Sequence, residues 1–186
     1  MTLAVAYHTL ALRSVIRGLN NAHAFITKGV AHIESQGHDP NDYLTTRLAP
    51  DMLNFTEQIQ RFTDAAKSIP PNVNPDIEKL TLPDEEKTFP ELLDRIKRTI
   101  AYLEGVDAKL FEGREGAEVT LKVRQGAIQI TFPTLEYVTV HAQPNFWFHV
   151  VTAYDILRMK GVPLGKFDFL NGAGLLNVEF VKKADE

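Results

Sequence analysis

Apolar residues recur at intervals of three and four positions in four long stretches of the chain, the spacing that puts side chains on one face of an α-helix. This pattern predicts helices over residues 3–36, 48–69, 88–104 and 134–160. The second stretch is the most regular, with apolar side chains at Leu48, Met52, Phe55, Ile59, Phe62, Ala66 and Ile69. Amphipathic helices bury their apolar faces against one another, so the pattern predicts a helical bundle.

Capping and helix-breaking residues mark the ends of these helices. Pro70 and Pro71 are expected to end the second helix, because proline lacks the backbone N–H donor and clashes with the preceding turn. Thr88 and Glu91 have the spacing of a capping box at the start of the third helix. Pro144 falls inside the fourth stretch, where it predicts a kink. The segment 72–87, rich in Pro, Asp and Glu, is expected to be an exposed loop.

A different pattern separates the third and fourth helices. The segments EVTLKV and AIQITF alternate apolar and polar residues on either side of RQG, which predicts a short β-hairpin. A hairpin alone is marginally stable, so this one is expected to pack on the helices. The predicted class is therefore all-α, with four long helices and a short hairpin between the third and the fourth.

Composition adds limits on the class of protein. The 186 residues suit one domain spanning 1–186, and the 44% of hydrophobic and 24% of charged residues are ordinary for a globular protein. A net charge of -4 provides no basic footprint for nucleic acid, and the lack of cysteine excludes disulfides and a thiolate nucleophile. No uncharged apolar run is long enough to span a membrane. These features favour a cytoplasmic location.

The candidate chemistry lies in the fourth helix. Asn145 and His149 are four residues apart, so they lie one above the other on one helix face. Phe146, Trp147 and Phe148 surround them with apolar surface. An imidazole in such a setting titrates near neutral pH and can act as a general base or a hydrogen-bond donor. His149 and Asn145 are therefore candidate catalytic residues, although a core histidine bonded to a neighbour has the same pattern.

Three longer strings carry a family resemblance. RLAPDM with Gln58 and Gln60 after it, FPELLDRIKRTIAYLEG, and PNFWFHVVTAYDILRMKGVPLGKFDFL resemble an uncharacterised branch, found in bacteria and fungi, of the DinB/YfiT-like superfamily. The resemblance implies an antiparallel four-helix bundle with a metal held by three histidines, two of them four residues apart on the fourth helix. His149 matches the second of these histidines, while Asn145 stands in place of the first.

The chain departs from this pattern at the metal site. The third histidine of the superfamily comes from the second helix, where this sequence offers Asp51, Gln58 and other polar residues but no histidine. An amide oxygen is a much poorer ligand than an imidazole for zinc, nickel or iron. We therefore expect neither a metal nor another cofactor, with a mixed site of His149, Asp51 and His32 as the alternative.

Further candidates complete the expected site. Asp51 is placed in the first turn of the second helix, as an orienting carboxylate or as a partner of the helix dipole. Gln58, Trp147 and His32 are candidate ligand-binding residues. Each has an alternative role: Gln58 in core hydrogen bonding, Trp147 in core or dimer packing, and His32 in compensating the dipole at a helix end.

Three functions remain open at this point. The first is a small-molecule binding protein or metal-free enzyme that uses His149. The second is a homodimeric structural or interaction module, because aromatic residues surround the fourth helix on every side. The third, implied by the resemblance alone, is a metal-dependent transferase or hydrolase. Neither nucleic acid nor a membrane is an expected partner.

Overall fold

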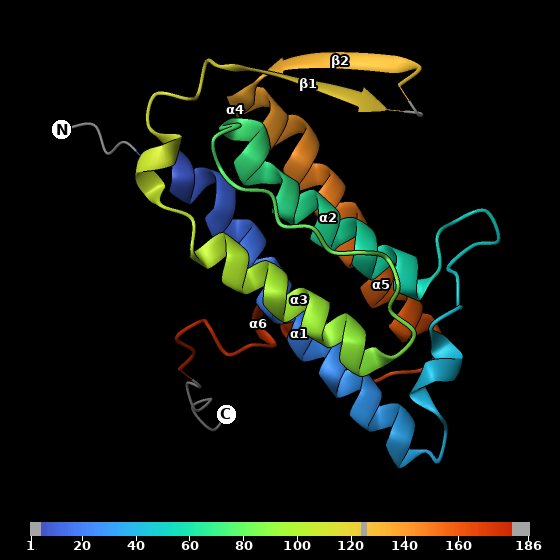
Figure 1. Ribbon diagram of the computed structural model, residues 1–186. Coiled ribbons are helices and arrows are strands. Elements are labelled where there is room, and N and C mark those ends of the chain that lie inside the picture. The colour runs from blue at the N-terminus through green and yellow to red at the C-terminus, as the bar shows by residue number, and fades with distance from the viewer. Residues whose placement is uncertain (1–4, 124–125, 180–186) are drawn as a thin grey trace, which may run out of the picture.

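Four long helices dominate the structure, a computed structural model that describes residues 5–123 and 126–179 (Figure 1). These are α1 (Tyr7–Ser35), α2 (Phe55–Val73), α3 (Phe89–Glu104) and α5 (Gln143–Met159). The shorter elements are η1 (Pro40–Tyr43), η2 (Ala108–Phe111), β1 (Glu118–Val123), β2 (Ile128–Pro133), α4 (Thr134–Glu136), η3 (Tyr137–Ala142) and α6 (Lys166–Asn171). The helical class and the hairpin predicted from the sequence are confirmed, whereas α6 and η2 were not predicted.

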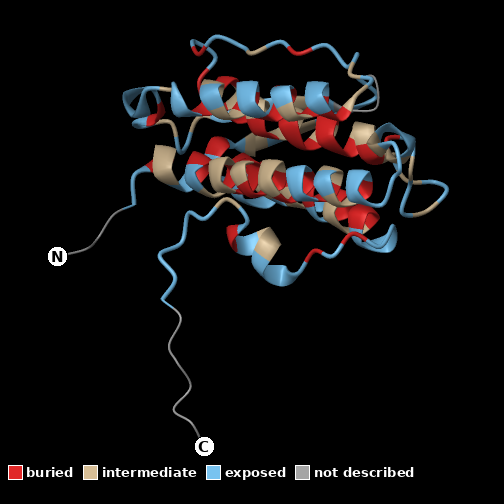
Figure 2. Cartoon of the chain, turned by 90° about the horizontal axis from the view of Figure 1, so that it is seen from below, coloured by how far each residue is buried: buried red, intermediate tan, exposed pale blue. Residues whose placement is uncertain are grey.

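The core lies between the long helices. α2 contacts α3 and α5, and α1 contacts α3, α5 and α6. Figure 2 shows that the buried residues line the inward faces of these helices. α1 and α5 approach closely at Gly18, where a Cβ atom would come within 2.7 Å of the rings of Phe146 and Trp147. Gly18 is thus required by this helix contact.

The start of α2 differs from the sequence prediction. The helix begins at Phe55, not at Leu48, because Asn54 and Glu57 form a capping box. The Asn54 side chain accepts from the N–H of Glu57 at 2.9 Å, and the Glu57 carboxylate accepts from the N–H of Asn54 at 2.7 Å. A β-bridge between Arg47 and Asn54 closes the preceding loop, in which residues 48–52 form bends and turns. The apolar periodicity before residue 55 is therefore not helical.

The end of α2 also differs. Pro70 and Pro71 were expected to stop the helix, but both lie inside it and the helix continues to Val73. They occupy the last turn and are buried in the core with Val73, so packing offsets the lost backbone bonds. The loop that follows is not wholly exposed either, since Ile77 and Leu82 are buried.

The remaining helix starts follow the sequence more closely. The predicted capping box at Thr88 and Glu91 is present at the start of α3. The fourth predicted helix is one helical run of α4, η3 and α5, and its irregular part is the π-helical turn η3, just before Pro144. Proline has no N–H to give to the carbonyl four residues earlier, which favours such a local change of helix type.

The hairpin pairs antiparallel, with Glu118 opposite Pro133 and Val123 opposite Ile128. Two of the turn residues, 124 and 125, lie outside the described residues. In the part of the chain that the structure describes, no helix is both long enough and apolar enough to cross a membrane.

Candidate functional site

The interface of α2 and α5 brings together two of the predicted site residues. The Nδ1 atom of His149 lies 2.6 Å from Oε1 of Gln58, whose side chain is 1% exposed. The Nε2 atom of Gln58 donates to the carbonyl oxygen of Leu53 at 3.0 Å. Farther along the interface, Nδ2 of Asn72 donates to the hydroxyl of Tyr137 at 2.7 Å. The helical run through η3 and α5 is therefore antiparallel to α2.

This hydrogen-bond chain fixes the protonation pattern of the imidazole. Because the amide nitrogen of Gln58 is committed to Leu53, its oxygen faces His149 as an acceptor. Nδ1 of His149 must then carry the proton, which leaves the lone pair of the neutral ring on Nε2. Burial, together with the positive charge of Arg61, lowers the pKa of His149 below its ordinary value of 6.5. The neutral, basic form is thus favoured at neutral pH.

Asn145 lies in a neighbouring polar cleft. It is exposed and one helical turn before His149, about 5.4 Å along the helix axis. The cleft has a volume of about 430 Å³ and is bounded by α2, β1 and the helical run from η3 into α5. The residues that line it are Arg61, Asp64, Ala65, Ser68, Asn72, Leu121, Lys122, Tyr137, His141, Ala142 and Asn145. Arg61 of this cleft also acts electrostatically on His149.

The other predicted site residues lie elsewhere. Asp51 is exposed in the turn before α2, not in its first helical turn, and makes no hydrogen bond or ion pair to the described residues. His32 lies in the last turn of α1, where no contact joins it to His149. Trp147 packs against Phe146 and against Phe169 of α6, at 5.0 and 5.9 Å between ring centroids. Its contacts are those of a packing residue.

The arrangement does not fit the three-histidine metal centre of the resemblance. Within residues 5–123 and 126–179, no three His, Asp or Glu side chains gather in a group able to hold a metal ion. Nδ1 of His149 is used by Gln58, and Asn145 adds only an amide. The donor set at this position is thus one imidazole nitrogen and amide groups, a poor match for zinc.

The sequence interpretation missed residues of the cleft. His141 is not among the candidates from the sequence, yet it lines the cleft with Tyr137 and Arg61. A signal was present, because His141, Asn145 and His149 follow one another at intervals of four residues on one helical run. The contribution of β1 had no such signal, since only the tertiary fold brings Lys122 to this place.

Comparison with known proteins identifies the class, a DinB-like helical protein. The chain is 32% identical to a DinB family member from Shewanella denitrificans whose crystal structure superposes with a TM-score of 0.80, over 88% of this chain and 90% of that one. Residues 7–170 match the family described as Domain of unknown function (DUF1993), and the chain belongs to this family. No curated protein matches the sequence. The resemblance predicted from the sequence is confirmed.

Proposed function

We propose that this protein binds a small molecule at the α2/α5 interface, where His149 serves as the proton acceptor of a metal-free site. The observation that carries the proposal is the hydrogen bond between Gln58 and His149. In enzymes that use histidine as a base, a partner on one ring nitrogen sets the tautomer and leaves the other nitrogen available for substrate. Gln58 supplies such a partner from a side chain that is itself held by Leu53.

The position of His149 supports the same proposal. The pKa of His149 is lowered, so Nε2 is free of its proton under ordinary conditions. A cleft large enough for a small ligand begins one turn away and contains Asn145, the residue that replaces the first metal histidine. Acid–base chemistry by a neutral imidazole needs no metal, which suits a donor set of one imidazole and two amides.

A ligand screen observed by NMR tests the proposal. In ¹⁵N-histidine spectra, His149 is expected to be the Nδ1–H tautomer and to titrate below pH 6.5. Members of a fragment library should perturb its signals, and His149→Ala should weaken their binding at least tenfold while the protein stays folded. The matched control is His32→Ala, which removes a histidine from the far end of α1. Fragments that bind His149→Ala as well as the wild type would contradict the proposal.

A second candidate function is the dimeric module. Phe148 on α5 is 55% exposed and Val151 is 41% exposed, while Phe167 on α6 is 55% exposed. Phe148 and Val151 are three residues apart and share one face of α5, and exposed large apolar side chains favour burial against another protein. Under this hypothesis, sedimentation velocity finds a dimer that Phe148→Ser dissociates.

We infer that the four long helices form a four-helix bundle, because α1 and α2 each contact both α3 and α5. Contrary to the expectation from the sequence, its neighbouring helices are not all antiparallel, since Phe55 packs on Phe89 and Thr63 bonds to Arg95, which makes α2 and α3 parallel. A single domain over residues 1–186 and a cytoplasmic location also stay predictions. The metal-dependent transferase or hydrolase is the hypothesis least supported by the donor set, and elemental analysis of untagged protein tests it.

A further inference from the structure

The cleft beside the π-helical turn has features of a binding site that His149 alone does not explain. Its volume of about 430 Å³ falls in the usual range for sites that enclose small molecules. Polar side chains reach it from three separate elements, namely α2, β1 and the run from η3 into α5. Irregular π-helical turns are rare and are often found at functional sites. Here the turn supplies both Tyr137 and His141 to the cleft.

Tyr137 provides a buried hydrogen-bond donor. The residue is 3% exposed, and its hydroxyl oxygen accepts from Nδ2 of Asn72 at 2.7 Å. This bond leaves the hydroxyl proton to be donated, and no acceptor for it lies among the described side chains and backbone atoms. Burial raises the pKa of Tyr137 to about 12, so the proton is retained throughout the physiological range. A buried donor of this kind calls for an acceptor in the cleft.

The charges around the cleft favour an anionic acceptor. Arg61 and Lys122 bring two cations to its lining, against the single carboxylate of Asp64. That carboxylate is already shared by three cations, since it contacts Lys67 at 2.5 Å, Arg95 at 2.8 Å and Arg61 at 3.3 Å. Its negative charge is therefore compensated within the protein. Arg61 is likewise paired, with Asp64 and Asp84, so the net positive charge at the cleft comes from Lys122, which has no ion pair to the described residues.

We propose that this cleft is a subsite for the oxyanion group of a small molecule, a carboxylate or a phosphate. The Tyr137 hydroxyl donates to one oxygen, and Lys122 supplies the opposite charge. His141, stacked on Tyr137 at 6.0 Å between ring centroids, closes the cleft beside it. The inference deepens the proposed function and rests on it for one point, that the rest of the ligand extends along the interface to His149.

Titration with two simple probes tests the subsite. Inorganic phosphate and acetate are added separately at constant ionic strength, and the backbone amide signals of residues 122, 137–143 and 145 are followed by NMR. Saturable shifts with a millimolar dissociation constant are expected for at least one probe. Tyr137→Phe should weaken binding about tenfold, as expected for a lost hydrogen bond to a charged group. The matched control is Tyr102→Phe, because the Tyr102 hydroxyl donates to the carbonyl of Glu78, outside the cleft.

A second variant keeps the test independent of folding. Lys122 is an exposed strand residue, so Lys122→Met should leave the fold intact and weaken binding severalfold, most strongly at low salt. Binding of acetate alone supports a carboxylate ligand, and binding of phosphate alone supports a phosphate. Absence of saturable binding for both probes overturns the inference, as does unchanged affinity in Tyr137→Phe.

The two proposals fail in different ways. If phosphate or acetate binds the wild type and His149→Ala equally while fragments also bind both equally, the subsite stands and the role of His149 falls. If neither probe binds but fragments depend on His149, the subsite falls and the proposed function stands.

Discussion

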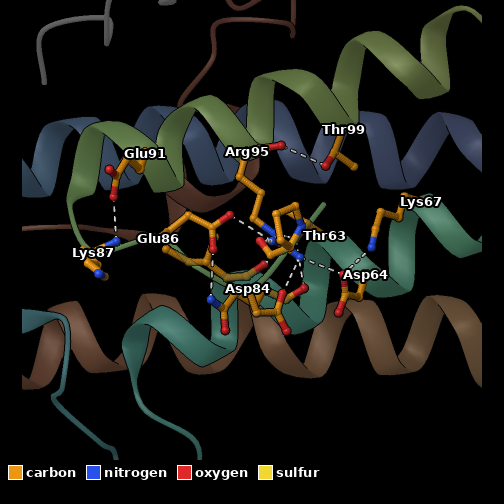
Figure 3. Close-up of polar contacts among 12 residues, drawn as sticks. Thr63, Asp64, Lys67, Asp84, Glu86, Lys87, Glu91, Arg95 and Thr99 are labelled. Atoms are coloured by element: carbon orange, nitrogen blue, oxygen red, sulfur yellow. Dashed lines mark hydrogen bonds and ion pairs between the residues drawn. The ribbon is translucent and has the colours of Figure 1, made fainter. Parts of the chain in front are cut away.

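Two groups of polar side chains include residues of α2, one around Arg95 and one at the α2/α5 interface, and they differ in how far their hydrogen bonds are satisfied. The Arg95 cluster joins α2, α3 and the loop between them, and Arg95 itself is 1% exposed (Figure 3). An arginine has five N–H donors, and here they form four hydrogen bonds and one further ion pair. The acceptors are Thr63 Oγ1 at 2.7 Å, Asp64 Oδ1 at 2.8 Å, and at 2.9 Å the Pro83 carbonyl, Glu86 Oε1 and Asp84 Oδ1. In the α2/α5 interface, by contrast, Nε2 of His149 and the proton of Tyr137 have no such partner among the described residues.

The difference separates a structural role from a functional one. A polar group whose hydrogen bonds are all satisfied inside the protein fixes the position of the elements that it joins. A polar group that keeps unused capacity beside a cleft is available to a ligand. The Arg95 cluster therefore accounts for how the loop 74–88 is held on α2 and α3, while the α2/α5 interface is the place to look for binding.

The largest effect is expected from Arg95→Met. This change leaves three carboxylates without their shared guanidinium. Breaking a fully buried ion pair costs about 3–5 kcal/mol, and the lower end of this range is expected here because Asp64 and Asp84 are partly exposed and keep Lys67 and Arg61. Urea denaturation should show a loss of that size in the free energy of unfolding. Arg98→Met is the matched control, since Arg98 is exposed on the same helix and has no ion pair among the described residues. If both variants were equally stable, the cluster would not be the structural centre that its hydrogen bonds indicate.

A smaller effect is expected from acid, in two separate pH windows. Burial of Glu86 by itself would raise the pKa of its carboxyl group, but hydrogen bonds from Gln60 and Arg95 outweigh it, so the pKa lies below 4.5. The pKa of His149 lies below 6.5, because burial disfavours the charged ring. In each case the unfolded chain takes up a proton first, so stability falls as the pH drops below 6.5 for His149 and below 4.5 for Glu86.

Substitutions at Glu86 and His149 test which residue causes the loss of stability in each pH window. Urea midpoints measured between pH 7 and pH 3 should show a smaller lower step in Glu86→Gln and a smaller upper step in His149→Ala. The lower step should not vanish, because hydrogen bonds also lower the pKa of Glu91 and, against the effect of burial, that of Asp168. Part of the upper step should persist in His149→Ala, because burial and the charge of Lys97 also lower the pKa of His23. A lower step unchanged in Glu86→Gln would mean that other carboxylates carry the acid sensitivity.

The sequence predicted the helices better than the site, for a physical reason. Periodicity and capping residues act locally, so the start of α3 at Thr88 was predicted in full, whereas the competing capping box at Asn54 moved the start of α2 by seven residues. The site depends on the register between helices. Gln58 and His149 are 91 positions apart, and only packing decides that they touch. Asp51 and His32 had suitable chemistry, but the fold placed them elsewhere.

The smallest effect on stability, and the sharpest contrast with Arg95, is expected from Asn145→Ala. An asparagine directly after Pro144 has two available roles, either to satisfy backbone groups freed by the proline or to face a ligand. Its side chain is exposed, lines the cleft and makes no hydrogen bond to the described residues, which favours the second role. Surface substitutions of this kind change the free energy of unfolding by less than about 0.5 kcal/mol. Fragment binding should nonetheless weaken severalfold by NMR titration, whereas a loss of stability with unchanged binding would return Asn145 to a purely structural role.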